Sequence, residues 1–406
     1  MNEKIKWLAN PMSQTETKTS VDFLSQDEIA KAKHFHSTFP DYTPTPLRSL
    51  NRLAEMLGVA GVYVKDESHR FGLNAFKVLG GSYAIGRCLA KRLGRDMAEM
   101  SFAELTADET REKLGDITFV TTTDGNHGRG VAWTARMLKQ KSIVYMPKGS
   151  SLARLENIEK EGAQAYITEF NYDDAVRHAA MNAHQFGWVI VQDTAWEKYK
   201  NVPTWIMQGY GTLAAEALEQ LNGMGIDQPS HVMVQAGVGS LAGAVQGYFA
   251  SAFPDNCPKM VVVEADKADC FYKSILAGDG SPRLVDGEMG TIMAGLACGE
   301  PNIIAWNILR DYSAMFVSCP DWVAAKGMRV LGNPLGNDPR IISGESGAVT
   351  TGLLFKLLED KGLEEARSAL QLDGNSRILL INTEGDTDPG KYRSIVWDGE
   401  YPSYGK

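Results

Sequence analysis

Asn74-Ala75-Phe76-Lys77-Val78-Leu79-Gly80-Gly81-Ser82 joins a strand-like run, 62–65, to an apolar, helix-like run that begins at Tyr83. A lysine at such a junction, flanked by small and apolar residues, loses hydration, and desolvation lowers the pKa of its ammonium group. The neutral amine is the nucleophile that an aldehyde cofactor needs for covalent attachment. A surface lysine that opens a helix would give the same local pattern, so the rest of the chain must decide between the two interpretations.

The middle third of the chain alternates between strand and helix patterns. Strand-like apolar runs lie at 117–121, 142–146, 165–168 and 188–192. Helical spacing of apolar residues separates them at 128–140, 152–161 and 173–186. This order predicts a parallel sheet with helices on both faces.

A second set of strands follows the first. Apolar runs lie at 232–235, 260–264, 314–317 and 378–381, with helical segments between them at 241–250, 321–330 and 345–359. The first set gives way to the second near Tyr199 to Met207. We therefore predict an α/β protein with two open, mostly parallel twisted sheets, each with helices on both faces.

Composition and charge limit the functions open to this chain of 406 residues. Its 44% hydrophobic and 22% charged residues are ordinary for a globular protein, and its length allows two subdomains. The formal net charge of −9 argues against nucleic acid or an anionic membrane as the main partner. Residues 1–20 are polar and no apolar run approaches the ~18–20 residues of a membrane span, so a cytoplasmic protein is expected. The five cysteines show no C-x-x-C spacing, so no metal site is expected.

Ligands of open α/β sheets bind outside the carboxyl ends of the strands, so the loops that follow strands are candidate binding segments. One is Thr122-Thr123-Asp124-Gly125-Asn126-His127-Gly128, whose polar side chains stand at a helix start, where backbone N–H groups attract anions. Asp124 or Asn126 could simply be the N-cap of that helix. The amide, the imidazole and the two glycines favour a carboxylate-binding loop, in which we expect His127 to pack locally rather than act as a base.

A second such loop, Ala236-Gly237-Val238-Gly239-Ser240-Leu241, carries a Gly-x-Gly at the start of a helix. Backbone amides at such a place can approach a phosphate group, although many tight turns share the pattern. The loop lacks the third glycine of a dinucleotide-binding site and the Gly-Lys-Ser/Thr of a P-loop. It is therefore a candidate phosphate loop of another kind.

Two more strand ends carry polar side chains. The loop Asn382-Thr383-Glu384-Gly385-Asp386 follows the last strand, and the Thr383 hydroxyl could donate a hydrogen bond to a ring nitrogen. An ordinary turn rich in Asp and Gly is the alternative. Asp193 follows the run 188–192 and is either a carboxylate of the site or a helix cap before Trp196.

Seven short motifs, taken in chain order, resemble those of the fold type II, or tryptophan-synthase-like, enzymes that depend on pyridoxal 5'-phosphate (PLP). They are Thr45-Pro46-Leu47, Lys65-Asp66-Glu67, Phe76-Lys77, Gly125-Asn126-His127, Gly237 to Ser240, Ala294 to Ala297 and Glu345 to Ala348. Two departures occur: Ala75 stands where the family has a serine, and the glycine-rich loop is short. The motifs extend over most of the chain.

Three residues are predicted to be catalytic, Lys77 and Asp124 from the resemblance and Asp193 from its place at a strand end. Lys77 would carry PLP and, once the substrate amine has released it, act as a general base beside the α-carbon. Asp124 and Asp193 would be further catalytic carboxylates. The family is dimeric, so a homodimer is expected as well.

The resemblance also implies where the cofactor binds. The phosphate would lie on the backbone of Gly237, Val238, Gly239 and Ser240, the phenolic oxygen on Asn126, and the pyridine nitrogen on Thr383. The active site would lie between a large PLP-binding domain, 1–88 and 204–406, and a small α/β domain, 89–203.

Longer segments, at 71–77, 123–130, 199–210, 344–348 and 383–388, resemble the ammonia-lyases of this family. Those enzymes convert 2,3-diaminopropionate to pyruvate and two ammonia, and they accept both enantiomers. Asp124 fits this substrate, because a carboxylate stabilises a second ammonium group at a position where the dehydratases carry a serine. We predict that Lys77 serves the L-form and Asp124 the D-form.

Three other functions remain as alternatives. The closest is a serine or threonine dehydratase, which has the same fold and cofactor. A dinucleotide-dependent oxidoreductase would need the glycine that is missing from the loop at Gly237. A non-catalytic ligand-binding protein of this fold would not need Lys77 at a strand-to-helix junction. The partner expected for the favoured function is a small amino-acid substrate.

Overall fold

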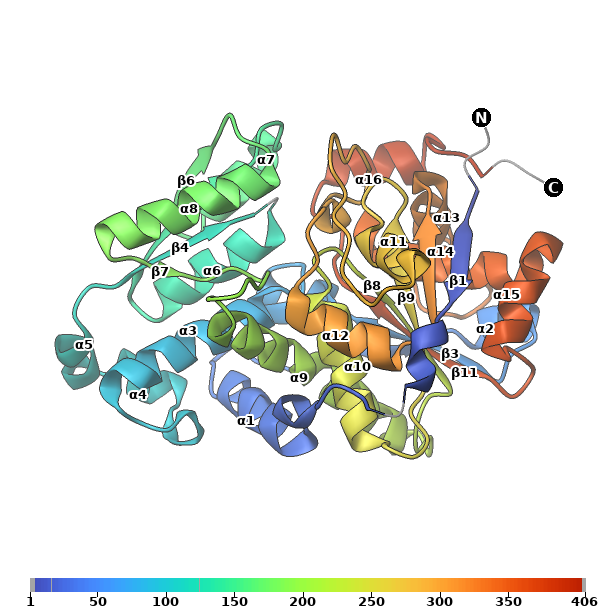
Figure 1. The fold of residues 1–406 in the computed structure, drawn as a ribbon, viewed down its shortest axis with the longest axis horizontal. Helices are drawn as coiled ribbons and strands as arrows, with labels where there is room; N and C mark the ends of the chain where they lie inside the picture. The colour runs from blue at the N-terminus through green and yellow to red at the C-terminus, as the bar shows by residue number, and fades with distance from the viewer. Residues whose placement is uncertain (1–3, 16, 124, 404–406) are drawn as a thin grey trace.

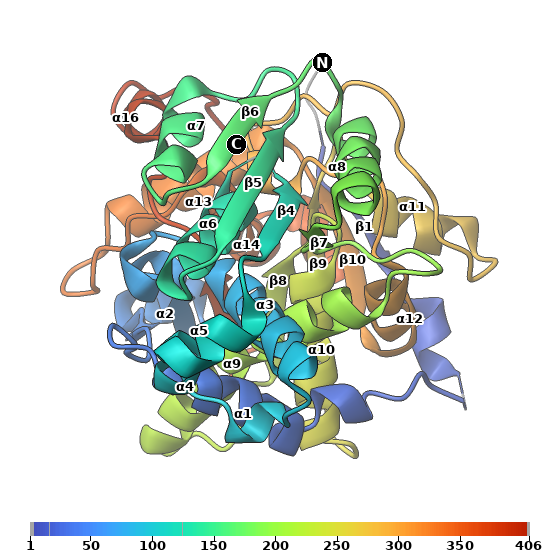
Figure 2. The same cartoon turned by 90° about the vertical axis from the view of Figure 1, so that its left-hand side faces the viewer.

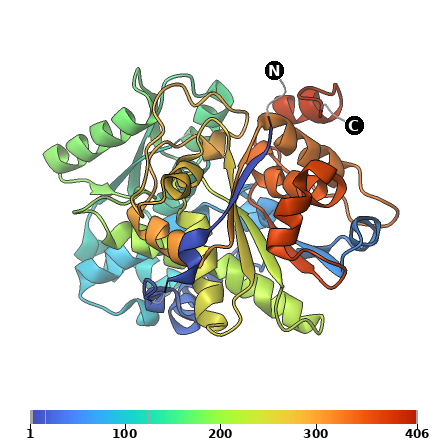
Figure 3. The same ribbon diagram turned by 45° about the vertical axis from the view of Figure 1, so that its right-hand side comes forward.

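A computed structural model describes residues 4–15, 17–123 and 125–403, and these residues form two β-sheets in separate lobes (Figure 1). The larger sheet has seven strands in the order β1-β10-β9-β8-β11-β3-β2. Their bounds are β1 (Lys6–Ala9), β2 (Leu47–Ser49), β3 (Gly61–Asp66), β8 (His231–Gln235), β9 (Lys259–Ala265), β10 (Met315–Cys319) and β11 (Arg377–Asn382). The five inner strands are parallel, and the edge strands β1 and β2 run antiparallel to their neighbours. Figure 3 shows β1, in blue, along the outer edge of this sheet.

The inner strands of the larger sheet are buried on both faces, because each is an almost unbroken apolar run. In β9, Met260 and Val262 point into one hydrophobic cluster, and Val261 and Val263 point into another. The first face is covered by α1 (Gln26–Ser37), α3 (Val78–Leu93), α9 (Asn201–Gly223), α10 (Ser240–Ala252), α11 (Cys270–Ala277) and α12 (Ile303–Tyr312). The second face is covered by α2 (Asn51–Leu57), α13 (Asp321–Gly332), α14 (Glu345–Glu359), α15 (Glu364–Leu370) and α16 (Pro389–Val396).

The smaller sheet has four parallel strands in the order β6-β5-β4-β7 (Figure 2). They are β4 (Thr118–Thr122), β5 (Lys141–Met146), β6 (Gln164–Ile167) and β7 (Val189–Ile190). Helices α6 (Asn126–Met137) and α7 (Leu152–Glu159) pack on one face, and α8 (Tyr172–Phe186) packs on the other. Two short helices, α4 (Phe102–Thr106) and α5 (Asp108–Leu114), connect α3 to this sheet.

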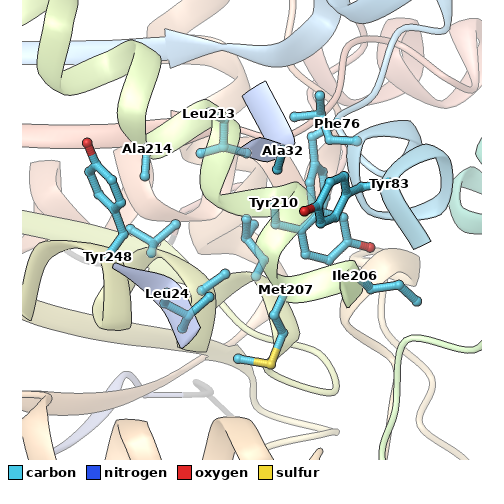
Figure 4. Close-up of a cluster of buried hydrophobic side chains, with 14 of the residues drawn as sticks. Leu24, Ala32, Phe76, Tyr83, Ile206, Met207, Tyr210, Leu213, Ala214 and Tyr248 are labelled. Atoms are coloured by element: carbon cyan, nitrogen blue, oxygen red, sulfur yellow. The ribbon is translucent and has the colours of Figure 1, made fainter. Parts of the chain in front are cut away.

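Helix α9 lies against α3, and glycine allows their close approach. A Cβ atom on Gly209 would stand 2.3 Å from the carbonyl oxygen of Leu79, so any larger residue there would push the helices apart. The ring of Tyr210, next along α9, packs on Phe76 with 4.8 Å between ring centroids. Figure 4 shows Tyr210 beside Phe76 and Tyr83 within this core. The residue that precedes Lys77 is thus held by an aromatic contact.

The predicted fold class, two mostly parallel sheets with helices on both faces, is confirmed. The predicted strand 188–192 is too long, since only Val189–Ile190 pair with β4. The chain turns away because the N–H of Gln192 donates to the Tyr199 hydroxyl (2.8 Å) instead of to a strand. The strands of the smaller sheet all lie within 89–203, and the domain bounds themselves stay a prediction.

Within the described residues, no helix is long and apolar enough to cross a membrane.

Candidate active site

The lysine segment is fixed to the end of the last strand. The N–H of Phe76 donates to the carbonyl of Thr383 (3.1 Å), and the N–H of Gly385 donates to the carbonyl of Asn74 (3.0 Å). A short 3₁₀ helix, Glu67–Gly72, leads from β3 to this segment, and α3 begins directly after Lys77. Because β11 pairs with β3, these contacts place Lys77 at the carboxyl ends of two central strands, as the sequence predicts.

Lys77 meets a buried carboxylate of the smaller lobe. Its Nζ lies 2.8 Å from Oδ2 of Asp193, and the Asp193 side chain is 3% exposed. Burial alone would raise the pKa of Asp193, but the Lys77 ammonium and the nearby His127 hold that pKa below its ordinary value. Asp193 is therefore an anion that orients the lysine amine. The alternative that Asp193 caps a helix before Trp196 is wrong, since the next helix, α9, begins at Asn201.

The backbone of Asp193 is held by the start of α10. The Ser240 hydroxyl donates to the Asp193 carbonyl, and Nδ2 of Asn302 donates to the Ser240 oxygen (2.8 Å). The side chain of Ser240 is thus occupied within the protein. Its backbone N–H remains in the first turn of α10, where the helix supplies no carbonyl partner.

The glycine loop before α10 has a conformation that suits glycine alone. Gly239 has φ +89°, and a Cβ atom there would stand 2.3 Å from the Phe271 ring. The carbonyl of Val238 accepts from the N–H of Asn302 (2.8 Å), which keeps the loop in place. The N–H groups of the first turn of α10, which have no carbonyl partner within the helix, and the positive end of its dipole together make an anion-binding end.

Thr383 faces the same pocket from the end of β11. It is 4% exposed, and Nε2 of Gln235, at the end of β8, donates to its hydroxyl oxygen at 3.2 Å. Among the described residues, Oε1 of Gln235 and Oγ of Ser346 are buried without a hydrogen-bond partner. Buried polar atoms of this kind mark a pocket that suits a polar ligand.

Asn126 and His127 occupy different environments. Nδ2 of Asn126, the first residue of α6, donates to the carboxylate of Glu384. His127 is 1% exposed and its Nε2 lies 2.8 Å from the carbonyl of Val191, so this ring packs locally as predicted. Behind Glu384, burial and the Glu384 charge raise the pKa of Glu345 to about 7.

These groups converge on one open pocket between the two lobes. Its lining includes the predicted residues Lys77, Asn126, Asp193, Gly237, Val238, Gly239, Ser240 and Thr383. Asp124, the remaining predicted residue, lies outside the described residues. Sequence reasoning missed Gln235, Ser346, Glu384 and Tyr210 as lining residues. For Gln235 the sequence does carry a signal, because a polar residue stands there at the end of an apolar strand.

In the part of the chain that the structure describes, no group of three or more His, Cys, Asp or Glu side chains could hold a metal ion.

Comparisons with known proteins agree with this geometry. Residues 38–383 match the family model described as pyridoxal-phosphate dependent enzyme. A diaminopropionate ammonia-lyase of Salmonella typhimurium is 51% identical over 401 residues, which cover 98% of this chain and 99% of that protein. A crystal structure of diaminopropionate ammonia-lyase from Escherichia coli in complex with D-serine superposes with a TM-score of 0.91 at 48% identity, covering 98% of each chain. A biosynthetic L-threonine dehydratase of S. typhimurium is 25% identical and covers 81% of this chain and 55% of the dehydratase.

Proposed function

Because this chain belongs to the family of pyridoxal-phosphate-dependent enzymes, we propose that it is a lyase that eliminates ammonia from 2,3-diaminopropionate. With one water, the reaction gives pyruvate and two ammonia. The observation that carries the proposal is the Lys77–Asp193 pair, which faces an anion-binding helix start across a single pocket.

The residues of the pocket fit PLP. The N–H groups at the start of α10 suit its phosphate. The Phe271 ring lies so close to Gly239 that this position has no space for a side chain. Lys77 would hold the aldehyde carbon, Asn126 would bind the phenolic oxygen and Thr383 the pyridine nitrogen. When bound, PLP supplies an electron sink for charge that develops at the α-carbon of the substrate.

The chain's own residues orient the lysine and move protons. Asp193 keeps the Lys77 amine at the pocket, and its backbone is tied to the phosphate loop through Ser240. Once the substrate amine has replaced it, Lys77 takes the proton from the α-carbon of the L-form. Asp124, the neighbour of Gly125 in the sequence, is proposed as the corresponding base for the D-form.

The diamino acid is favoured over serine or threonine as the substrate. The chain is 51% identical to an ammonia-lyase over nearly the full length of both proteins, against 25% to a threonine dehydratase that it covers only in part. The Glu384 carboxylate also lines the pocket and favours a ligand with a second ammonium group.

The test measures cofactor attachment and product stoichiometry together. The purified protein should absorb visible light, and borohydride reduction followed by peptide mapping should fix the cofactor on Lys77. With 2,3-diaminopropionate it should release two ammonia for each pyruvate, whereas a dehydratase acting on serine releases one. A label on another lysine, or faster turnover of serine, contradicts the proposal.

We also propose that the enzyme is a homodimer in the cytoplasm. Two-fold pairing is the commonest assembly of soluble proteins. Analytical ultracentrifugation of the holoenzyme should give twice the mass of one chain, and a monomer at working concentration contradicts this.

A further inference from the structure

Helix α6 of the smaller lobe is tied to the turn that precedes Lys77. Nη1 of Arg129, on α6, donates to the carbonyl oxygen of Leu73 at 3.0 Å. The other side of the guanidinium is held by Glu161, whose Oε1 lies 3.2 Å from Nη2 and 3.3 Å from Nε. The planar guanidinium therefore links a carboxylate of the smaller lobe to the backbone of the larger lobe.

The turn that Arg129 reaches has a strained backbone. Phe71 has φ +49° and Asn74 has φ +59°, a region that brings a Cβ atom against the following carbonyl oxygen. Such a conformation persists only where the surroundings hold it. The carbonyl of Asn74 accepts from the N–H of Gly385 (3.0 Å), and the carbonyl of Leu73 accepts from Arg129. The turn is thus held by one contact from each lobe.

Helix α6 also packs along the rest of the segment 71–78. The Trp133 ring, on α6, lies on Phe71 with 5.0 Å between ring centroids. A Cβ atom on Gly130 would stand 2.8 Å from the Cα atom of Val78, so α6 touches the backbone directly after Lys77. The backbone of Lys77 therefore takes its position from the smaller lobe as well as from β11.

We propose that Arg129 is a positioning residue that holds the turn before Lys77, so that the lysine amine reaches the α-carbon of the L-substrate as a base. The inference rests on the proposed function, since it concerns the proton transfer assigned there to Lys77. Among the described residues that line the pocket Arg129 does not occur, so it acts through the backbone of Leu73.

The argument follows from what the turn loses without the guanidinium. Leu73 is 5% exposed, and a buried carbonyl that loses a charged donor is destabilised. The strained turn then relaxes, and the lysine that follows it shifts. A misplacement of about 1 Å costs a base roughly 10²-fold in rate. The D-form is affected less, because Asp124 is the base proposed for it.

The test compares two arginines that share one carboxylate. Arg129→Met removes the guanidinium and keeps an unbranched side chain. Arg136→Met is the matched control, because Arg136 lies on the same helix and pairs with the other oxygen of Glu161 at 2.7 Å. Among the described residues, the hydrogen bonds of Arg136 go to Glu161 alone, so this variant leaves the link to Leu73 in place.

Two measurements on the holoenzymes separate positioning from stability. Hydrogen exchange, followed by mass spectrometry, should be faster over residues 71–77 in Arg129→Met than in the wild type and in Arg136→Met. In Arg129→Met, kcat for L-2,3-diaminopropionate should fall by roughly ten- to hundredfold and kcat for the D-form much less. The ratio of the two kcat values does not depend on the fraction of folded enzyme, so a merely structural role would leave it unchanged.

Each outcome decides the inference. An L-to-D ratio of kcat in Arg129→Met that equals that of the wild type overturns it, and so does exchange over residues 71–77 that matches Arg136→Met. If Arg129→Met does not fold, Glu161→Ala, which removes the carboxylate behind Arg129, should show both changes, and an unchanged ratio there overturns the inference. A wild type that releases no ammonia from either enantiomer contradicts the proposed function and the inference with it.

Discussion

Gly239→Ala is expected to weaken cofactor binding without changing any charged group. The residue has φ +89°, a region that costs a residue with a Cβ atom about 1–2 kcal/mol. The new methyl would also stand 2.3 Å from the ring of Phe271, which is fully buried and cannot move freely. Overpacking of this kind costs about 1–3 kcal/mol.

The two contributions together amount to about 2–5 kcal/mol, since the strain and the clash act on the same loop. If the loop shifts to relieve them, its N–H groups no longer converge on the phosphate. The dissociation constant for PLP should then rise by roughly thirty- to several-thousandfold. Gly239→Asp adds a carboxylate against the phosphate and should abolish retention of the cofactor.

Titration of the apoenzyme with PLP, followed by absorbance, measures the effect. Gly278→Ala is the matched control, because Gly278 has φ +73° and nothing within 4 Å of the new Cβ atom. It should lower stability by about 1–2 kcal/mol and leave the affinity for PLP unchanged. Adding Phe271→Leu to Gly239→Ala should restore part of the affinity. If Gly239→Ala binds PLP like the wild type, the assignment of this loop to the phosphate is wrong.

Three further changes test other parts of the site. Asp193→Asn removes the charge that orients Lys77, so pyruvate formation from the L-form should fall by about 10²-fold or more, and an unchanged kcat/KM contradicts the role of Asp193. Asp124→Asn should reduce turnover of the D-form by roughly 10²–10⁴-fold and that of the L-form far less; equal losses point to simple binding of the second ammonium group. Burial and the charge of Glu384 raise the pKa of Glu345 from 4.5 to about 7. Between these two pH values the folded protein holds a proton that the unfolded chain has lost, so the free energy of unfolding falls as the pH rises from 4.5 to about 7. The free energy of unfolding of Glu345→Gln, measured in urea, should therefore exceed that of the wild type by up to about 3 kcal/mol at a pH above this interval and by little at a pH below it. An equal difference at both pH values contradicts the raised pKa.

Apolar periodicity predicted most strands and helices, because the inner strands are buried on both faces and read as continuous apolar runs. Helix α14 begins and ends at the predicted residues, 345 and 359. The strand at 188–192 was predicted too long. Its pairing ends before Gln192, whose N–H donates to the Tyr199 hydroxyl. A side-chain contact of this kind does not change the apolar pattern of the sequence, so the pattern could not predict it.

Residues of the candidate site could be predicted from the sequence where they directly follow a strand or begin a helix. Lys77, Asp193 and Thr383 all obey that rule. Sequence could not show that Lys77 and Asp193 form a pair, because they are 116 positions apart and belong to different lobes. Gln235 was missed as a lining residue for a related reason, since the backbone carbonyls that fix its amide come from α14 and β11, far away in the sequence.

The position of β11 has a consequence for how the pocket forms during synthesis. This strand, made from residues 377–382, lies between β8 and β3 and is the last strand of the described residues. Until the ribosome has released it, β3 has no parallel neighbour in the sheet, and the segment before Lys77 has no partner at Thr383. Contacts so distant in sequence form slowly, and incomplete chains of this size expose apolar surface. The nascent chain therefore exposes apolar surface until β11 inserts, and the Thr383 side of the pocket forms only with that strand.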